Sequence, residues 1–270
     1  MALSMALLLG LSSCSAGSAK NHYILAEKLW NESKYPAAVS EFEKVISKDP
    51  RGKLGQQALF RAASTQSLFL AKYPEAVQKF KAYAEIAGDT PSAWEAERQI
   101  GDIFFLKLQH YEDAIVQYQG LITRKPVSPD VPEFKFRIAK SHFYLRHFDQ
   151  ALSAFRELKS KYPLSPWAEK AEFEIGVTAF TRGEQHPGGR GPGMEAYHEA
   201  MDDFQRFIRV HPESPLNVQS RFWIASCLEE LDQLDAAQQA YEDLRKTYPS
   251  PNVIEIKLAR IRERKSQRNH

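Results

Sequence analysis

One pattern recurs six times in this chain of 270 residues and constrains its fold more than any other feature. An aromatic residue or leucine is followed by alanine three positions later, by an aromatic residue after four more, and by proline after eight more. The copies are Tyr35, Ala38, Phe42, Pro50; Tyr73, Ala76, Phe80 with Gly88 and then Pro91; Tyr111, Ala114, Tyr118, Pro126; Phe148, Ala151, Phe155, Pro163; Tyr197, Ala200, Phe204, Pro212; and Leu234, Ala237, Tyr241, Pro249. They begin 38, 38, 37, 49 and 37 residues apart, and a fixed period of this length is the mark of a repeat architecture.

A column of small residues accompanies the pattern, nine or ten residues upstream of five copies. This small column is Ala26, Ala63, Gly101, Ala139, Gly176 and Ala225, with Gly176 displaced from its copy. A small side chain lets a first helix, helix A, approach a second helix, helix B, closely. In helix B the alanine and the aromatic four positions later lie on one face. The proline ends helix B, and single hairpins bury too little apolar surface to fold alone, so the pattern predicts stacked helix hairpins.

The six copies resemble the tetratricopeptide repeat (TPR), and the resemblance covers Tyr23 to about Pro251. It implies an all-α fold, a TPR α-solenoid of about six hairpins over residues 22–251 with a C-terminal capping helix. Junctions such as Tyr162-Pro-Leu-Ser-Pro166 and His211-Pro-Glu-Ser-Pro215 are similar to those of two groups of bacterial envelope proteins. One is the BamD/ComL lipoprotein family of the outer-membrane β-barrel assembly machine. The other is the YbgF/CpoB family associated with the Tol-Pal system.

The N-terminus does not follow the repeat. Met1 to Leu11 form an apolar run, too short for a membrane span and suited to the core of a signal peptide over residues 1–13. Leu11-Ser-Ser-Cys14 resembles the bacterial lipoprotein processing signal. The resemblance implies acylation of Cys14, a lipidated tether over residues 14–21, and sorting to the outer membrane because Ser15 follows the cysteine. The alternative is a buried N-terminal helix with an ordinary cysteine.

The fifth repeat is longer than the others by about a dozen residues, at Arg182 to Gly193, which hold five of the 13 glycines. We expect a loop there, serving as a tether or as a partner-binding segment. A phosphate-binding loop is disfavoured because the Gly-Lys-Ser/Thr motif and a preceding strand are missing. A comparable loop insertion occurs in the BamD family, although in an earlier repeat.

Composition and motifs argue against catalysis and nucleic-acid binding. The formal net charge is +2, too low for a strongly basic nucleic-acid binder. His186, Glu195, His198 and Glu199 match no metal-ligand spacing, so we expect neither a metal nor another cofactor there. Cys227 is predicted to be a buried, inert thiol of helix A in the sixth repeat. We therefore predict a protein that is not an enzyme and has no small-molecule substrate.

Stacked hairpins expose a concave face built mainly from helix A, and positions three before, one after and four after the small column are predicted to line it. The candidates for this partner-binding groove are Tyr23, Glu27, Trp30; Phe60, Ser64, Ser67; Arg98, Asp102, Phe105; Phe136, Lys140, Phe143; Phe173, Val177, Phe180; and Phe222, Ser226, Glu229. Aromatic and charged side chains in this arrangement suit an extended peptide or a partner helix. We expect about half of the aromatics to pack against neighbouring repeats instead.

The C-terminal segment, residues 252–270, begins as an amphipathic helix and ends basic, with six Lys or Arg from Lys257 onward. A polar capping helix is the expected structure, and contact with acidic lipid or wall polymer is the alternative. Together these features predict a scaffold on the periplasmic face of the outer membrane. Its partners are expected to be envelope proteins, with barrel assembly favoured. A Tol-Pal, wall-synthesis or division role, a pilotin-like role in secretin assembly, and a metalloprotein at residues 186–199 are the alternatives.

Overall fold

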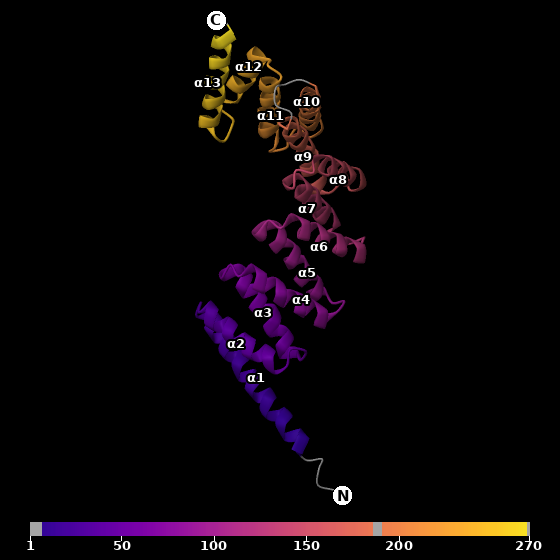
Figure 1. Cartoon of the computed structure of the whole chain (residues 1–270), viewed down its shortest axis with the longest axis vertical. Helices are drawn as coiled ribbons and strands as arrows, with labels where there is room; N and C mark the ends of the chain where they lie inside the picture. Colours follow the sequence, from indigo (N-terminus) through magenta and orange to yellow (C-terminus); the bar gives the residue numbers. More distant parts are fainter. Residues whose placement is uncertain (1–6, 186–190, 269–270) are drawn as a thin grey trace. The chain divides into compact units, whose positions relative to one another are not determined.

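The computed structural model describes the backbone of residues 7–185 and 191–268, with side chains from Gly17 onward (Figure 1). Every regular element in these ranges is helical, so the predicted all-α class is confirmed. The chain divides into two compact units, Met1–Pro126 and Val127–His270. No helix in the described ranges is long and apolar enough to cross a membrane.

The first unit contains three helix hairpins. They are α1 (Leu7–Asn31) with α2 (Tyr35–Lys48), α3 (Lys53–Phe69) with α4 (Tyr73–Ala87), and α5 (Pro91–Asp102), continued by the π-helix η1 (Ile103–Leu108), with α6 (Tyr111–Arg124). Each helix packs against the next one along the chain. Of the predicted signal peptide, residues 1–6 lie outside the described range. The backbone of the predicted tether, residues 14–21, is part of α1.

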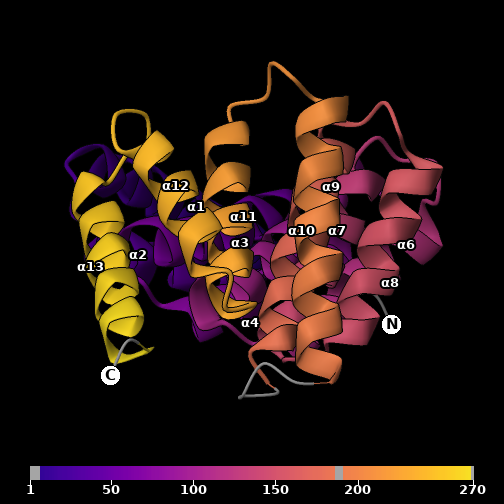
Figure 2. The ribbon, with the colours of Figure 1, turned by 90° about the horizontal axis from the view of Figure 1, so that it is seen from above.

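The second unit contains three further hairpins and a final helix. They are α7 (Val131–Tyr144) with α8 (Phe148–Lys161), α9 (Pro166–Gly183) with α10 (Pro192–Val210), α11 (Asn217–Glu230) with α12 (Leu234–Leu244), and α13 (Pro251–Arg268). Figure 2 shows α11, α12 and α13 side by side, and α13 packs on α12 through the buried side chains of Ile254, Leu258 and Ile261. The six predicted hairpins and the capping helix are thus present.

The repeated residues form the core of each hairpin. Alanines of the small column and of helix B, together with the second aromatic of each copy, are buried almost completely. At Gly101 the approach is close, since an added Cβ would lie 2.7 Å from Cε1 of Tyr118. Helix B ends two residues before Pro50, Pro126 and Pro163, as expected for proline.

The turn from helix A to helix B has a conformation that the sequence pattern did not reveal. Five hairpins place a non-glycine residue in the left-handed region, two positions before the first residue of helix B: Ser33, Ala71, Gln109, Arg146 and Asp232, with φ of 59°, 52°, 55°, 61° and 64°. The next backbone N–H then donates to a carbonyl five or six residues earlier, as from Lys34 to Leu29 at 2.9 Å. This left-handed closure satisfies carbonyls at the end of helix A.

The insertion in the fifth repeat lengthens the hairpin as well as its loop. Helix α9 continues to Gly183 and α10 begins at Pro192, so the loop is shorter than the predicted 182–193, and residues 186–190 lie outside the described range. Gly176 faces the Phe204 ring as Gly101 faces Tyr118, so its larger distance in sequence from the helix-B pattern leaves its contact with the second aromatic unchanged. The added turns bring Gly183 against the ring of Tyr197.

Candidate partner-binding surface

The aromatic column three residues before the small column is committed to packing within its own hairpin. Five of these rings meet the buried second aromatic of helix B: Tyr23–Phe42, Phe60–Phe80, Phe136–Phe155, Phe173–Phe204 and Phe222–Tyr241, with centroid distances of 5.6, 5.5, 5.6, 5.6 and 5.7 Å. The third hairpin has the half-buried Arg98 at this position. All five rings of this column pack within their own hairpin. Phe136 also packs against Trp167 of the next hairpin at 5.1 Å, a contact between repeats of the kind that we expected for about half of the groove aromatics.

The column four residues after the small column packs on the first residue of helix B. The pairs are Trp30–Tyr35, Phe105–Tyr111, Phe143–Phe148 and Phe180–Tyr197, at 6.0, 5.9, 5.7 and 5.2 Å. Such edge-to-face and tilted pairs add stability beyond area burial. The aromatic residues four positions after the small column therefore pack helix A on the start of helix B, and this contact area is not available to a partner.

The intervening column, one residue after the small column, links neighbouring hairpins by polar contacts. Glu27 accepts two hydrogen bonds from Arg61 at 2.9 and 2.8 Å, joining α1 to α3. Lys140 lies 3.0 Å from Glu174, joining α7 to α9 with the charges reversed. The half-buried bidentate contact of Arg61 with Glu27 fixes one orientation of the two groups.

The remaining positions of this column behave differently from one hairpin to the next. Asp102 accepts a hydrogen bond from the Tyr118 hydroxyl at 2.8 Å, inside its own hairpin. Ser226 is buried with its hydroxyl 2.9 Å from that of Tyr241. Ser64 and Val177 are half-buried, as is Ser67 of the column four residues after the small column.

A cleft in the first unit gathers part of the predicted groove. Its volume is about 510 Å³, and its lining residues come from α1, α3, α4 and α5: Tyr23, Lys53, Gln56, Gln57, Phe60, Arg61, Tyr83 and Ser92. Of the predicted residues, Tyr23 and Phe60 are brought together here. Burial, with the nearby Glu27 carboxylate, raises the pKa of Tyr23 above its ordinary value, so its hydroxyl stays protonated. The cleft thus combines rings with hydroxyl, amide and cationic groups.

Sequence reasoning missed the helix-B contribution to this cleft. Tyr83 follows Phe80 by three residues, and its ring lies 5.2 Å from that of Phe60. The sequence feature that could have indicated Tyr83 is its position about one helical turn after Phe80, the second aromatic of the copy, on the same face of helix B. Gln56 and Gln57 lie one helical turn before Phe60 and Arg61 on α3, so a search for polar residues along helix A could have found them.

The side chains that the sequence offered as candidates for catalysis or metal binding do not come together in the structure. Cys227 is free and fully buried, as predicted, and burial raises the pKa of its thiol to about 12. Glu199 pairs with Arg156 and Arg182, and His198 is exposed, while His186 lies outside the described residues. Among the described side chains, those of residues 17–185 and 191–268, no three His, Cys, Asp or Glu converge to hold a metal ion.

The basic C-terminal helix uses its charges inside the second unit. The fully buried Glu229 carboxylate lies 3.0 Å from Nζ of Lys257 and 3.1 Å from Nε of Arg260. Arg264 donates to the main-chain oxygen of Glu229 at 3.1 Å. Lys265 and Arg268 pair with Asp235 and Asp232. These contacts favour the capping role over the alternative of an anion-binding tail. Glu229, predicted to line the groove, is instead the centre of this network.

Comparisons with known proteins agree with this architecture. A family model described as Tetratricopeptide repeat matches residues 134–165 and 219–251. A comparison with curated protein sequences found no significant match. Among solved structures, PilW, described as a widely conserved type IV pilus biogenesis factor, superposes with a TM-score of 0.53 at 14% identity, covering 90% of this chain and 97% of PilW.

Two further solved structures are similar at TM-scores below that of PilW. MamA from Desulfovibrio magneticus RS-1 gives 0.48 at 13% identity, covering 73% of this chain and 97% of the other. YrrB, described as a TPR protein with an unusual peptide-binding site, gives 0.47 at 16% identity, covering 74% and 90%. The family model thus matches two segments of the second unit, and the likeness to PilW shows that the helix-hairpin fold is shared.

Proposed function

We propose that the chain is a lipid-anchored scaffold of the outer membrane, on its periplasmic face, that binds envelope proteins and has a BamD-like role in outer-membrane protein assembly. The cleft of the first unit carries the binding part of this proposal. It joins rings of Tyr23, Phe60 and Tyr83 to the amides of Gln56 and Gln57 in about 510 Å³. Rings with adjacent hydrogen-bonding groups suit an extended segment of a protein partner, whose backbone amides need both donors and acceptors.

The anchor rests on the Leu-Ser-Ser-Cys14 sequence and the apolar residues before it. Acyl chains contribute about 0.8 kcal/mol per buried CH₂, so more than one chain gives a stable anchor. Cys14→Ser removes the thiol that carries the lipid. We expect the variant in the soluble fraction of a bacterial cell lysate and the native chain with the outer membrane. A Cys14→Ser protein that remains membrane-bound would contradict the anchor.

The cleft is tested with a substitution that leaves the packing intact. Gln57 is exposed on α3 and lines the cleft, so Gln57→Arg adds bulk and charge there without disturbing a core contact. Gln78→Arg makes the same change at an exposed position of α4 and is the matched control. We expect affinity purification from detergent-solubilised membranes to recover barrel-assembly subunits with the native chain and the control, and fewer with Gln57→Arg.

Other partners would redirect the proposal. Recovery of Tol-Pal or wall-synthesis proteins in their place would replace the BamD-like role with a YbgF/CpoB-like one. Recovery of secretin or pilus-assembly proteins would indicate a pilotin-like role. Equal recovery of every partner with Gln57→Arg and with the native chain would show that the cleft is not the binding site.

A further inference from the structure

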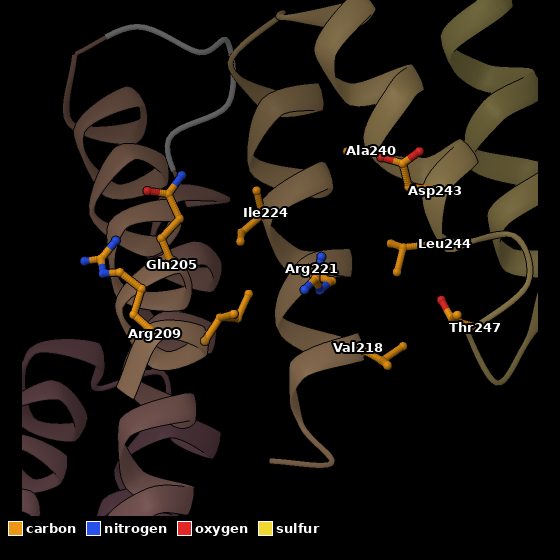
Figure 3. A pocket seen from close by; sticks show the side chains of 10 residues that line it. Gln205, Arg209, Val218, Arg221, Ile224, Ala240, Asp243, Leu244 and Thr247 are labelled. Carbon is orange, nitrogen blue, oxygen red and sulfur yellow. The ribbon is translucent and has the colours of Figure 1, made fainter. Parts of the chain in front are cut away.

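An apolar groove crosses the second unit between the B helices of its last two hairpins. Figure 3 shows it between α10 and α12, with side chains of α11 in the middle. Its volume is about 700 Å³, and Ile208, Val218, Ile224, Ala240 and Leu244 supply apolar lining. The polar lining includes Gln205, Arg209, Arg221, Asp243 and Thr247. The basic charges therefore outnumber the acidic ones.

The sixth hairpin lacks a polar pair that most other hairpins form through the residue four positions before the small column. In four other hairpins a polar side chain at this position contacts a helix-B residue of opposite type: His22–Glu41, Glu97–Arg124, Lys135–Glu157 and Glu172–Lys159, at 2.7, 2.9, 2.9 and 2.6 Å. Arg221 is the residue at this position in the sixth hairpin. It is exposed, and within the described ranges it forms no ion pair.

The acid nearest in register does not neutralise this arginine. Asp243 occupies the position in α12 that Glu157 occupies in α8, two residues after the second aromatic. Its Oδ1 accepts a hydrogen bond from the Gln239 amide at 2.9 Å instead. Arg209, across the groove on α10, is also exposed and without an ion pair in the described part of the chain. Two cations thus flank an apolar floor.

We propose that this groove binds an amphipathic helix of a partner protein, with acidic side chains beside its apolar stripe. The wall on the α12 side offers residues 240, 243 and 244 at helical spacing on α12, and Thr247 in the turn that follows it. A helix of this type fills such a groove with residues at i, i+3, i+4 and i+7. Its carboxylates supply to Arg221 and Arg209 the counter-charge that the other hairpins supply internally. The proposal uses α10, α11 and α12 alone and does not depend on the occupant of the first unit's cleft.

The test uses two synthetic peptides with the same apolar residues at helical spacing, one flanked by Glu and the other by Lys. Fluorescence anisotropy with the purified full-length chain measures the affinity of each. We expect the Glu peptide to bind more tightly, and its affinity to fall as salt is added. Arg221→Glu should weaken it about tenfold or more and should make the Lys peptide the tighter ligand. Asp243→Asn should strengthen binding of the Glu peptide, because a competing carboxylate is removed.

Arg262→Glu is the matched control, because Arg262 is exposed on α13 and the substitution changes net charge by the same amount. It should leave both affinities unchanged. Equal binding of the two peptides, or the same loss with Arg262→Glu as with Arg221→Glu, would overturn the proposal. A dimer of the native chain that Arg221→Glu dissociates, measured by sedimentation, would also overturn it, since a second copy would then occupy the groove.

Discussion

Gly101→Ala adds one methyl group where helix A and helix B approach closely, and it has two opposing effects on stability. Alanine in a helix is about 1 kcal/mol more favourable than glycine. The new Cβ, however, would lie 2.7 Å from Cε1 and 3.0 Å from Cζ of Tyr118. That ring is fully buried, and its hydroxyl donates to Asp102, so it cannot move aside freely. Overpacking of this kind costs about 1–3 kcal/mol, so we expect a net loss of stability of about 1 kcal/mol.

Gly120→Ala, in helix B of the same hairpin, isolates the helix-propensity effect. Gly120 is exposed on α6, and an added Cβ would meet nothing within 4 Å. This variant should be about 1 kcal/mol more stable than the native chain, so the two substitutions should shift the urea midpoint in opposite directions. Circular dichroism of urea unfolding measures both. Stabilisation by Gly101→Ala equal to that by Gly120→Ala would refute the close-approach argument.

Three other variants test the core and the cap. Glu229→Ala should destabilise the second unit by about 1–3 kcal/mol in urea unfolding, because Lys257, Arg260 and the Tyr241 hydroxyl lose a buried partner. The half-exposed pair of Glu230 with Arg260 should contribute under about 1 kcal/mol. Asp203→Asn should raise the melting temperature at neutral pH. Ala71→Gly should stabilise by up to about 1 kcal/mol, since glycine relieves the left-handed φ; an unchanged or lower urea midpoint would contradict this.

The sign of the Asp203 effect follows from its surroundings. Burial raises the pKa of this carboxyl above its ordinary value, although Arg206 lies 3.0 Å from Oδ1, and Oδ2 is buried without a hydrogen-bond partner. An acid whose pKa is raised on folding binds fewer protons in the unfolded state than in the folded state at pH values between the two pKa values. The native chain therefore loses stability as the pH rises through this interval. The advantage of Asp203→Asn should therefore shrink in acid, as the native carboxyl becomes protonated. An advantage independent of pH would contradict this cause.

The helix order was predictable because each hairpin repeats one local arrangement. Alanine and an aromatic at i and i+4, a small residue upstream and a downstream proline each act within one hairpin, so their spacing predicts both helices and their contact. The left-handed residues that close helix A were not predictable. Ser33, Ala71, Gln109, Arg146 and Asp232 share no side-chain type, because the turn is fixed by backbone hydrogen bonds between the packed helices.

The candidate site was only partly predictable, for a related reason. Periodicity gives the direction of a side chain from its helix, but not whether a second helix covers that direction. Phe136 and Phe173 were correctly placed on one face of helix A, yet rings of helix B occupy their contact surface. The cleft of the first unit contains Tyr83, which comes from helix B and which a helix-A rule does not include.

The same periodicity becomes informative where a repeat departs from it. In most hairpins the position four residues before the small column forms a polar pair that the chain completes internally, and such a pair leaves little for a partner to bind. At Arg221 the chain supplies the cation and an apolar floor, while the acid in register, Asp243, is bound to Gln239. An exposed cation beside apolar surface gains more from an external carboxylate than a cation already paired, because no internal contact is lost on binding. The missing polar pair at Arg221 is therefore the reason for proposing the apolar groove between α10, α11 and α12 as a binding surface.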